Sequence, residues 1–547
     1  MIRKQILPAL LLLSGGLFTT HFSFSQDSTK RKTIEITSTF KPVLREAVKI
    51  NFNAAPPSVD SSKVNLNYNI PAQNLFLTYQ PGSLKPVALE VDSTSAWKFS
   101  NYVKAGVGNV HLPYLQAGFS SGDGKNSFLN VFAKHLSSKG SLPFQKNSQT
   151  GVGIAGTLKT RNNLEWNANV GFNSDDYFFY GFRPDSLSYS KNELLQRFQT
   201  FEGKVSLRNI EPTKYGINFY PNFKTAVFSG KNEFRKATES NTVLNLPIQK
   251  TFGKSFGFNA GFTANLTSYR PASKKTIQNN LYYFTPSLLL KTPNLFLQTG
   301  IIPSWDNGAF TMLPNILADI TTNDKRFTVQ LGWLGYYDKG SYQRFASVNP
   351  WILQPEVLNN TRIQERYAGF KGSVLNHFTY SAKVGFVQYH NMPLFVNDST
   401  DGKTFLTVYS SAMESLQLHG EVGYTQGEVF SAVAKLTWNQ YSKVKDQKRA
   451  WGLLPFEFNA AVNWQLMKDF WFKSELSAWD GAAYRTKSKE PRKGETGFDL
   501  NAGLEFKITR QLNLWLQFNN LFNNTYERWN QYKVYGFNLL GGVVFTF

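Results

Sequence analysis

From about Trp97 to the last residue, apolar and polar residues alternate along stretches of about ten residues. In the stretch 164–172, the even positions carry Trp166, Val170 and Phe172, whereas Glu165 and Asn169 occupy odd positions. The stretches 416–425, 498–507 and 512–519 show the same alternation. A period of two predicts β-strands with one apolar and one polar face. Because strands of soluble sandwiches also alternate, this pattern alone does not identify what the apolar face contacts.

The connections between these stretches alternate between short and long. Short links such as 160–163, 252–254 and 467–469 separate longer polar connections. The longer connections lie at 177–196, 230–239, 269–279, 339–361, 393–414, 443–454, 484–496 and 524–536. Such an alternation is typical of outer-membrane barrels, in which short turns face the periplasm and long loops face outside.

The number of connections predicts the number of strands. About ten long loops after residue 138 give about 20 strands, and a hairpin at 101–108 and 112–121 brings the total to about 22. Bacterial single-chain barrels have an even strand number. We therefore predict an all-β fold, a transmembrane antiparallel up-and-down β-barrel of about 22 strands, with roughly 20 to 24 left open.

The chain ends within an alternating strand. One face of this strand carries Phe537, Leu539, Gly541, Val543, Phe545 and Phe547. A final strand with an aromatic last residue resembles the signal that the barrel-assembly machinery recognises during biogenesis. The alternative is a soluble protein that ends in a strand, which the loop pattern disfavours.

The N-terminus has the features of a secretory signal peptide. Arg3 and Lys4 precede a mostly apolar run at 6–18, and Ser23 and Ser25 supply small residues for cleavage. We expect residues 1–25 to be removed. An uncleaved anchor helix is the alternative, but the run is short for a bilayer, which needs about 20 apolar residues. No later window is long and apolar enough for a spanning helix, so a membrane contact must use strands.

The segment 26–96 departs from the barrel pattern, and we assign 97–547 to the barrel. Prolines, including Pro42, Pro71 and Pro86, interrupt any long element in this segment. A short strand is predicted at Thr33, Ile34, Glu35, Ile36, Thr37 and Ser38. The segment could lie in the lumen, act as a periplasmic tether, bind a partner by strand addition, or be an extended linker.

Composition excludes several classes of protein. Of 547 residues, 15% are aromatic and only 18% are charged, which is unlike a disordered polyelectrolyte. The absence of Cys excludes disulfides, thiolate metal sites, a cysteine nucleophile and a lipidated cysteine. The mean hydropathy of −0.33 argues against a bundle of membrane-spanning helices.

The net charge of +22 suggests anionic partners. A signal peptide and a barrel argue against nucleic acid as that partner. The basic residues Arg485, Lys487, Lys489, Arg492 and Lys493 fit the phosphates of outer-membrane lipid and lipopolysaccharide better. Lys507 is predicted to face the lumen, and the alternative for all of these charges is a solvated surface.

No constellation of residues indicates catalysis, a metal or a cofactor. The six His residues, His21, His111, His135, His377, His390 and His419, lack metal-ligand spacing. Asp175 and Asp176 are adjacent, so in a strand they point to opposite faces and make a poor acid–base pair. Asp398 and Asp401 lack the Glu of a calcium loop and indicate a turn. We therefore expect no enzyme activity and no cofactor.

The C-terminal region resembles TonB-dependent outer-membrane receptors, in particular receptor-like barrels of the Bacteroidetes type that have little or no plug domain. The resemblance rests on the stretches 498–503, 512–516, 519–527 and 541–547, of which Asn520-Leu521-Phe522-Asn523 before Tyr526-Glu527 is the most specific. It implies a barrel of 22 strands and uptake coupled to TonB, with Thr33–Ser38 as the contact strand. Residues 26–96 look too short for the plug domain of family transporters, which leaves energised uptake open.

Three functions remain. The first is a receptor-like barrel involved in transport of a solute across the cell outer membrane, with TonB as a partner. The second is an accessory or scaffold subunit of an outer-membrane complex that does not transport. The third is a passive pore.

Overall fold

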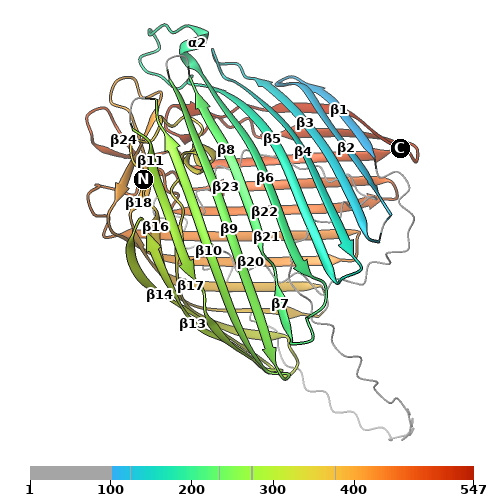
Figure 1. Ribbon diagram of the computed structural model, residues 1–547. Coiled ribbons are helices and arrows are strands. Elements are labelled where there is room, and N and C mark those ends of the chain that lie inside the picture. Colours follow the sequence, from blue (N-terminus) through green and yellow to red (C-terminus); the bar gives the residue numbers. More distant parts are fainter. Residues whose placement is uncertain (1–100, 124, 233–234, 273–274, 376) are drawn as a thin grey trace, which may run out of the picture. The chain divides into compact units, whose positions relative to one another are not determined.

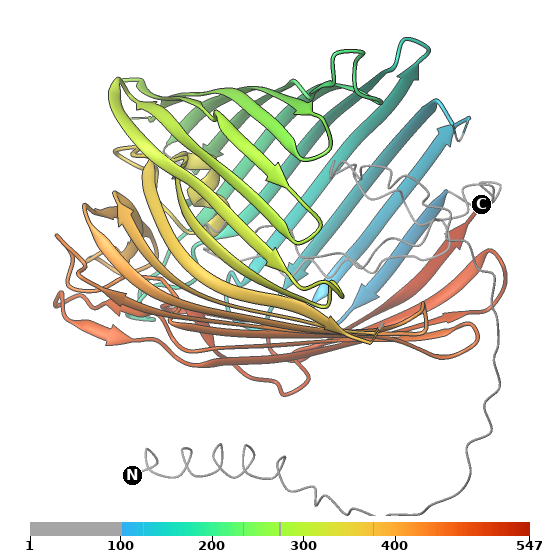
Figure 2. The ribbon, with the colours of Figure 1, turned by 90° about the horizontal axis from the view of Figure 1, so that it is seen from below.

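The protein folds into one closed antiparallel β-barrel. The computed structural model describes residues 101–547 except 124, 233–234, 273–274 and 376. Each strand pairs with its neighbour in the chain order of the barrel, and the first strand β1 pairs with the last strand β30. Figure 2 shows this ring from below, with the blue strands of the N-terminal side meeting the red strands of the C-terminal side. The predicted all-β barrel of 22 strands is confirmed.

The first half of the wall is seen at the front of Figure 1. Its strands are β1 (Tyr102–Gly108), β2 (His111–Gly122), β3 (Ser127–Lys139), β4 (Lys146–Thr160), β5 (Leu164–Phe178), β6 (Leu195–Asn209), β7 (Ile217–Phe219), β8 (Asn222–Lys231), β9 (Lys236–Phe252), β10 (Phe256–Arg270), β11 (Ile277–Phe284), β12 (Ser287–Lys291) and β13 (Leu295–Asp306).

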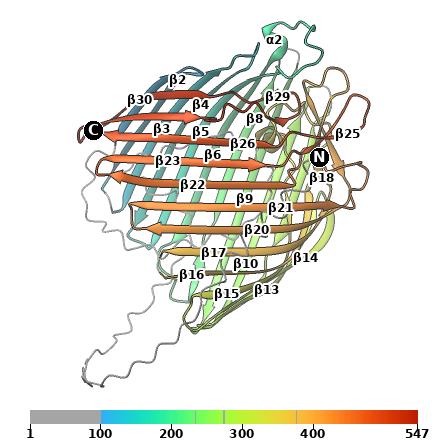
Figure 3. The same ribbon diagram turned by 180° about the vertical axis from the view of Figure 1, so that it is seen from behind.

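The second half completes the ring, and Figure 3 shows much of it from behind. Its strands are β14 (Ala309–Thr321), β15 (Phe327–Asp338), β16 (Thr361–Val374), β17 (Phe378–His390), β20 (Met413–Gln426), β21 (Phe430–Ser442), β22 (Phe456–Met467), β23 (Phe470–Trp479), β26 (Gly497–Lys507), β27 (Leu512–Asn519) and β30 (Asn538–Thr546).

Proline interrupts two of the wall strands. β7 and β8 both pair with β9 and are separated at Pro221, and β11 and β12 both pair with β10 and β13 and are separated at Pro286. Proline has no N–H to donate to a neighbouring strand, so the ladder breaks locally without ending the strand. Each pair therefore counts as one strand of the ring, which gives the 22.

The two faces of the wall have the reverse polarity of a soluble protein. On β5, the apolar side chain of Trp166 is 43% exposed, whereas the adjacent Glu165 is only 4% exposed and bonds Arg208. The same outward apolar face carries Val170 and Phe172. An apolar band around a closed barrel with buried charge inside is the arrangement that a lipid bilayer stabilises.

The seam between β1 and β30 is packed around one tryptophan. Trp515 of β27 is 1% exposed and faces inward, where it contacts Tyr114, Leu540 and Val544. The ammonium of Lys104 lies 4.0 Å from the Trp515 ring centroid. A Cβ on Gly106 would approach the Trp515 ring to 2.5 Å, so glycine is required at this position.

Five of the long outer connections in the described part of the chain carry elements of their own. These are α2 (Lys191–Leu194), α3 (Tyr342–Val348), β18 (Met392–Asn397), β19 (Phe405–Ser410), β24 (Ala483–Arg485), β25 (Pro491–Lys493), β28 (Glu527–Trp529) and β29 (Tyr532–Lys533). The predicted strict alternation is wrong at one later link, because β13 and β14 join at the outer end through only Asn307 and Gly308. No helix in the described residues is long and apolar enough to span a membrane.

Candidate functional site: a chamber beneath the packed outer loops

The outer loops share a hydrophobic core. We call the connections 179–194, 339–360, 391–412, 443–455, 480–496 and 520–537 the loop cap. Buried residues from several of them, including Phe179, Phe345, Phe405 and Trp529, pack together and against the inner wall at Phe228 and Tyr269. A second buried group joins Leu394 and Trp451 to the wall strands β16 and β17. The loops therefore form a packed layer at the outer end of the barrel.

Three aromatic rings join the cap across large distances in sequence. Trp351 stacks on Tyr532 with their centroids 3.9 Å apart and the planes 24° apart. Tyr180 approaches both rings edge-on, at 4.9 Å from Tyr532 and 6.1 Å from Trp351. Stacked and edge-on pairs stabilise a contact beyond the area they bury. This cluster ties the loops 179–194, 339–360 and 520–537 to one another.

Polar contacts fix the loop 339–360 to the wall. The Gln196 side chain of β6 donates to the carbonyls of Pro350 and Ile352 at 2.8 and 3.0 Å. The Trp351 indole N–H donates to the carbonyl of Phe178 at 3.1 Å. Glu239 of β9 accepts the first backbone N–H groups of α3, at 2.6 Å from Tyr342. Buried groups that are bonded in this way hold a loop in one position.

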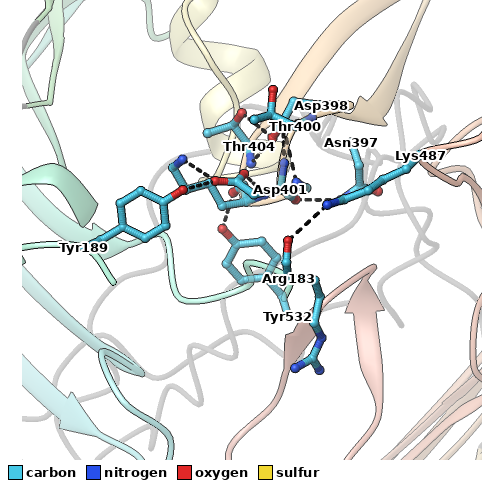
Figure 4. A network of polar contacts seen from close by, with 11 residues as sticks. Arg183, Tyr189, Asn397, Asp398, Thr400, Asp401, Thr404, Lys487 and Tyr532 are labelled. Atoms are coloured by element: carbon cyan, nitrogen blue, oxygen red, sulfur yellow. Dashed lines mark hydrogen bonds and ion pairs between the residues drawn. The ribbon is translucent and has the colours of Figure 1, made fainter. Parts of the chain in front are cut away.

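A polar network joins four loops of the cap, and Figure 4 shows it. The backbone N–H of Arg183 donates to the carbonyl of Asp401 at 2.9 Å, and Lys487 donates to the carbonyl of Arg183 at 3.1 Å. The Tyr189 hydroxyl donates to the Asp401 carboxylate. The Tyr532 hydroxyl donates to the carbonyl of Lys403. We call this network the polar clasp.

The Asp401 carboxylate is the centre of the polar clasp. Burial by itself raises its pKa, but hydrogen bonds from Lys403 and Tyr189 outweigh burial and hold the pKa below its ordinary value. The Lys403 ammonium lies 2.6 Å from Asp401 Oδ2. Asp398 accepts backbone N–H groups of Thr400 and Thr404 at 2.9 and 3.0 Å. Its oxygens thus organise a turn, as the sequence indicated.

A cavity of about 480 Å³ lies between the cap and the inner wall. Its aromatic lining comes mainly from the cap and includes Tyr180, Trp351, Tyr526, Trp529 and Tyr532. We call this cavity the chamber. A volume of this size is within the range of small-molecule binding sites, and the lining combines aromatic rings with many charged and amide side chains.

The charged residues of the chamber are separated in space. Glu457, Glu475 and Asp499 come from the neighbouring strands β22, β23 and β26. Lys134 and Lys146 come from β3 and β4, on the other side of the seam strands β27, β30, β1 and β2. A row of amide side chains leads from the acidic group toward the seam: Asn501 is the cross-strand partner of Glu475, and Asn519 is the cross-strand partner of Asn538. The Asn519 side chain donates a hydrogen bond of 2.7 Å to Asn538 Oδ1 within this row.

Arg528 brings an incompletely bonded cation to the chamber. It is 8% exposed, and its Nη2 donates to the carbonyl of Gly452 at 3.1 Å. Its Nε and Nη1 have no hydrogen-bond partner among the described residues, and neither does the indole Nε1 of the adjacent Trp529. Burial lowers the pKa of Arg528 to about 10, against the opposing effect of Glu457, so the guanidinium is charged at neutral pH.

The residues of the predicted assembly signal share one face of the last strand, β30, and of the residues next to it. Phe537, Leu539, Val543, Phe545 and Phe547 are exposed on the outer side, whereas Leu540 and Val544 are buried inside. Their role in assembly stays a prediction. The predicted signal peptide 1–25 and the contact strand Thr33–Ser38 lie outside the described residues.

The sequence predicts membrane girdles of aromatic residues near strand ends, with some of them packed inside loops instead, and it does not separate the two groups. The residues concerned are Trp451, Trp464, Phe470, Trp471, Trp515, Phe522 and Trp529. Trp464 and Phe522 are exposed at the outer surface, as a membrane girdle requires. Trp451 and Trp529 are instead buried in the cap, and Trp515 is buried against the inner wall. Their flanking sequence does not reveal this, because aromatic residues suit a lipid interface and a protein core equally.

Several of the His and Asp residues considered for metal binding or acid–base chemistry form hydrogen bonds or ion pairs within the wall. His111 bonds Ser138 at 2.7 Å, and His135 bonds Thr150 at 2.8 Å. Asp176 forms an ion pair with Arg197 at 2.6 Å, while Asp175 lies on the other face of β5, as expected. Both residues belong to a strand rather than to a loop. Lys507 shares the inward face of β26 with Glu505 and Asn501.

The Arg528 site was missed by the sequence analysis. The only local signal is a charged residue between Tyr526 and Trp529 in a loop otherwise rich in Asn. The acidic residues of β22, β23 and β26 lie on the predicted polar faces, but the sequence does not show that they meet the cap at one cavity.

Solved structures show the same fold. The chain matches the FpvA–pyoverdine complex of Pseudomonas aeruginosa with 11% identity and a TM-score of 0.61, over 82% of this chain and 71% of that one. It matches the ferric enterobactin receptor PfeA with 10% identity and a TM-score of 0.63, over 82% and 81%. The FrpB iron transporter of Neisseria meningitidis gives 8% and 0.62, over 82% and 81%. No protein-family model and no curated protein matches the sequence.

Proposed function

We propose that the protein is a TonB-dependent receptor-like barrel of the bacterial outer membrane that takes part in transport of a solute. The observation that carries this proposal is a chamber of about 480 Å³ that lies between a 22-strand wall and a packed loop cap. The structural neighbours are named as FpvA bound to pyoverdine, as a ferric enterobactin receptor and as an iron transporter. Their fold supports the same class of activity here.

The partners follow from this placement. TonB, or another periplasmic protein, is the proposed partner of the segment Thr33–Ser38, which could add as a strand to its sheet. The barrel-assembly machinery is the proposed reader of the final strand. Lipopolysaccharide phosphates are the proposed partners of the basic residues in 480–496, where Lys493 already pairs with Asp480 at 2.6 Å.

The scaffold and the passive pore remain as alternatives with distinct signatures. The packed core of the loop cap disfavours a pore that stays open, because several buried aromatic residues would have to separate. A scaffold needs no solute and would be recognised by a stable partner in the outer membrane.

Two measurements on the full-length protein, purified from outer membranes, test the proposal together. The first is association with the periplasmic domain of TonB, which we expect for the unmodified protein and not for an Ile34→Pro, Ile36→Pro variant. Proline removes N–H donors and disfavours strand pairing. A proline at Asn53, elsewhere in the same segment, is the matched control and should leave the association intact.

The second measurement is conductance in a planar lipid bilayer. We expect no steady conductance, because the loop cap packs across the outer end. Steady conductance without TonB association would favour the passive pore. A stoichiometric outer-membrane partner with neither conductance nor TonB association would favour the scaffold. Either result would overturn the proposed function.

A further inference from the structure

Several of the buried polar atoms that lack a partner belong to residues that line the chamber. Five buried atoms of residues that line it lack a hydrogen-bond partner among the described residues: Arg528 Nε and Nη1, Trp529 Nε1, Asn147 Oδ1 and Asp499 Oδ1. Leaving a buried donor or acceptor unpaired costs about 1–3 kcal/mol, and more for a charged group. Groups of this kind at one cavity are the expected feature of a site that is completed by a bound molecule.

The donors determine one part of that molecule. Arg528 and Trp529 both offer N–H groups from β28 in the cap, and a guanidinium and an indole can donate but not accept. The Arg528 guanidinium lies 4.6 Å from the Trp529 ring centroid, which holds its orientation. The bound molecule must therefore present hydrogen-bond acceptors to the cap, and carbonyl or carboxylate oxygens meet this requirement.

The wall determines the charge of the molecule. The described lining carries four cationic side chains, Lys134, Lys146, Arg528 and Lys533, and three anionic ones, Glu457, Glu475 and Asp499. This near balance disfavours a polyanion such as a nucleotide or a polyphosphate. Because the acidic group and the lysines of β3 and β4 stand on separate parts of the wall, the balance favours a molecule whose opposite charges are themselves separated.

The remaining lining suits amide groups and flat side chains. The row of Asn501, Asn519 and Asn538 offers both donors and acceptors from the acidic group toward the seam. Tyr180, Trp351 and Tyr526 provide aromatic surface. A peptide backbone has donors and acceptors of the same kind, an ammonium at one end and a carboxylate at the other.

We propose that the chamber binds a short peptide with free termini. Its ammonium lies toward Glu475 and Asp499, its carboxylate toward Lys134 and Lys146, and its carbonyl oxygens accept from Arg528 and Trp529. This inference rests on the proposed function, since it names the class of solute that the barrel carries. The binding site that we propose consists only of residues of the described wall and loop cap.

The test is calorimetric titration of the full-length protein in detergent with the tripeptide Ala-Phe-Ala. N-acetylated and C-amidated forms of the same peptide each remove one terminal charge. We expect the free peptide to bind and each blocked form to bind about tenfold more weakly or worse, the range for a charge-assisted hydrogen bond. Maltotriose, a neutral polar solute of similar size, should not bind.

Protein variants then assign the ends. Glu475→Gln should weaken binding of the free and amidated peptides and leave the acetylated peptide unchanged. Lys134→Gln should weaken the free and acetylated peptides and leave the amidated peptide unchanged. This crossed pattern is a double-mutant cycle between protein and ligand, and a merely structural role of either residue would weaken all three equally.

Matched controls lie outside the chamber. Lys139→Gln at the end of β3 and Glu490→Gln in the exposed hairpin should bind all three peptides as the unmodified protein does. The inference is overturned when the blocked peptides bind as tightly as the free one, when each variant weakens all peptides alike, or when maltotriose binds and the tripeptide does not. TonB association and conductance use no peptide, so such a result leaves the proposed function to its own test.

Discussion

The wall and the loop cap place their aromatic residues in opposite environments. In the wall, Trp166 and Phe172 point away from the protein while Glu165 is enclosed with Arg208. In the cap, Trp351, Trp529 and Tyr532 are enclosed by other loops, as in a soluble protein. The wall depends on lipid for its apolar face, whereas the cap depends on contacts between loops.

This difference predicts that the two regions respond independently. Wall strands are held by backbone hydrogen bonds to both neighbours around a closed ring, so a change in a loop leaves them paired. The cap has no such ladder across its loops and relies on a few large side chains. Binding at the chamber needs both regions, because Arg528 comes from the cap and Glu475 from the wall.

The largest expected effect is local to the cap. Trp351→Ala removes the ring that stacks on Tyr532 and the N–H that bonds Phe178. Truncation of a buried aromatic residue costs about 3–5 kcal/mol. Hydrogen exchange should show loss of protection in 339–360 and 520–537 with unchanged protection in the wall strands.

Trp166→Ala is the matched control for this prediction. It removes the same side chain from the lipid-facing side of β5, where lipid can fill the space. The loops should stay protected in this variant. Loss of wall protection in Trp351→Ala would mean that cap and wall unfold as one unit, and the comparison would fail.

The next effect separates the two faces of one wall strand. Val170→Arg places a charge on the apolar outer face of β5, where an arginine near the bilayer midplane costs about 2–4 kcal/mol. Asn173→Arg places the same side chain on the inward face of the same strand and should change stability by about 0.5 kcal/mol or less. Urea unfolding in lipid vesicles measures both, and equal costs would contradict the assigned faces.

The sequence predicted the wall because each strand pairs with the strand next to it along the chain. Alternation over 164–172 identifies both faces of β5 without knowledge of any distant residue. The strand count followed from the links, even though the outer link at Asn307 and Gly308 is short. Contacts between residues distant in the sequence contribute little to the structure of a wall strand, because a barrel strand contacts mainly its neighbouring strands and the lipid.

The cap and the chamber could not be predicted in the same way. The cluster of Tyr180, Trp351 and Tyr532 joins residues far apart in sequence, in loops without periodicity. Trp451 and Trp529 could therefore not be distinguished by sequence from residues of a membrane girdle. The separation of charge in the chamber depends on which wall strands on the two sides of the seam are reached by the loops of the cap, and a single sequence contains no signal for that.

The smallest effect probes the polar clasp by pH. Because the pKa of Asp401 is held below its ordinary value of 3.8, its stabilising contribution is complete above that value and is lost as the pH falls through the lower, folded-state pKa. Asp401→Asn keeps the shape but removes the charge, and should weaken protection of 391–412 at neutral pH by roughly 1 kcal/mol. Exchange rates corrected for the intrinsic effect of pH should show a decline below about pH 4 in the unmodified protein and no such decline in the variant. Asp185→Asn is the control, because its ion pair with Arg183 is exposed and should leave the profile unchanged. Identical profiles for Asp401→Asn and the unmodified protein would show that the cap is held by its aromatic core alone.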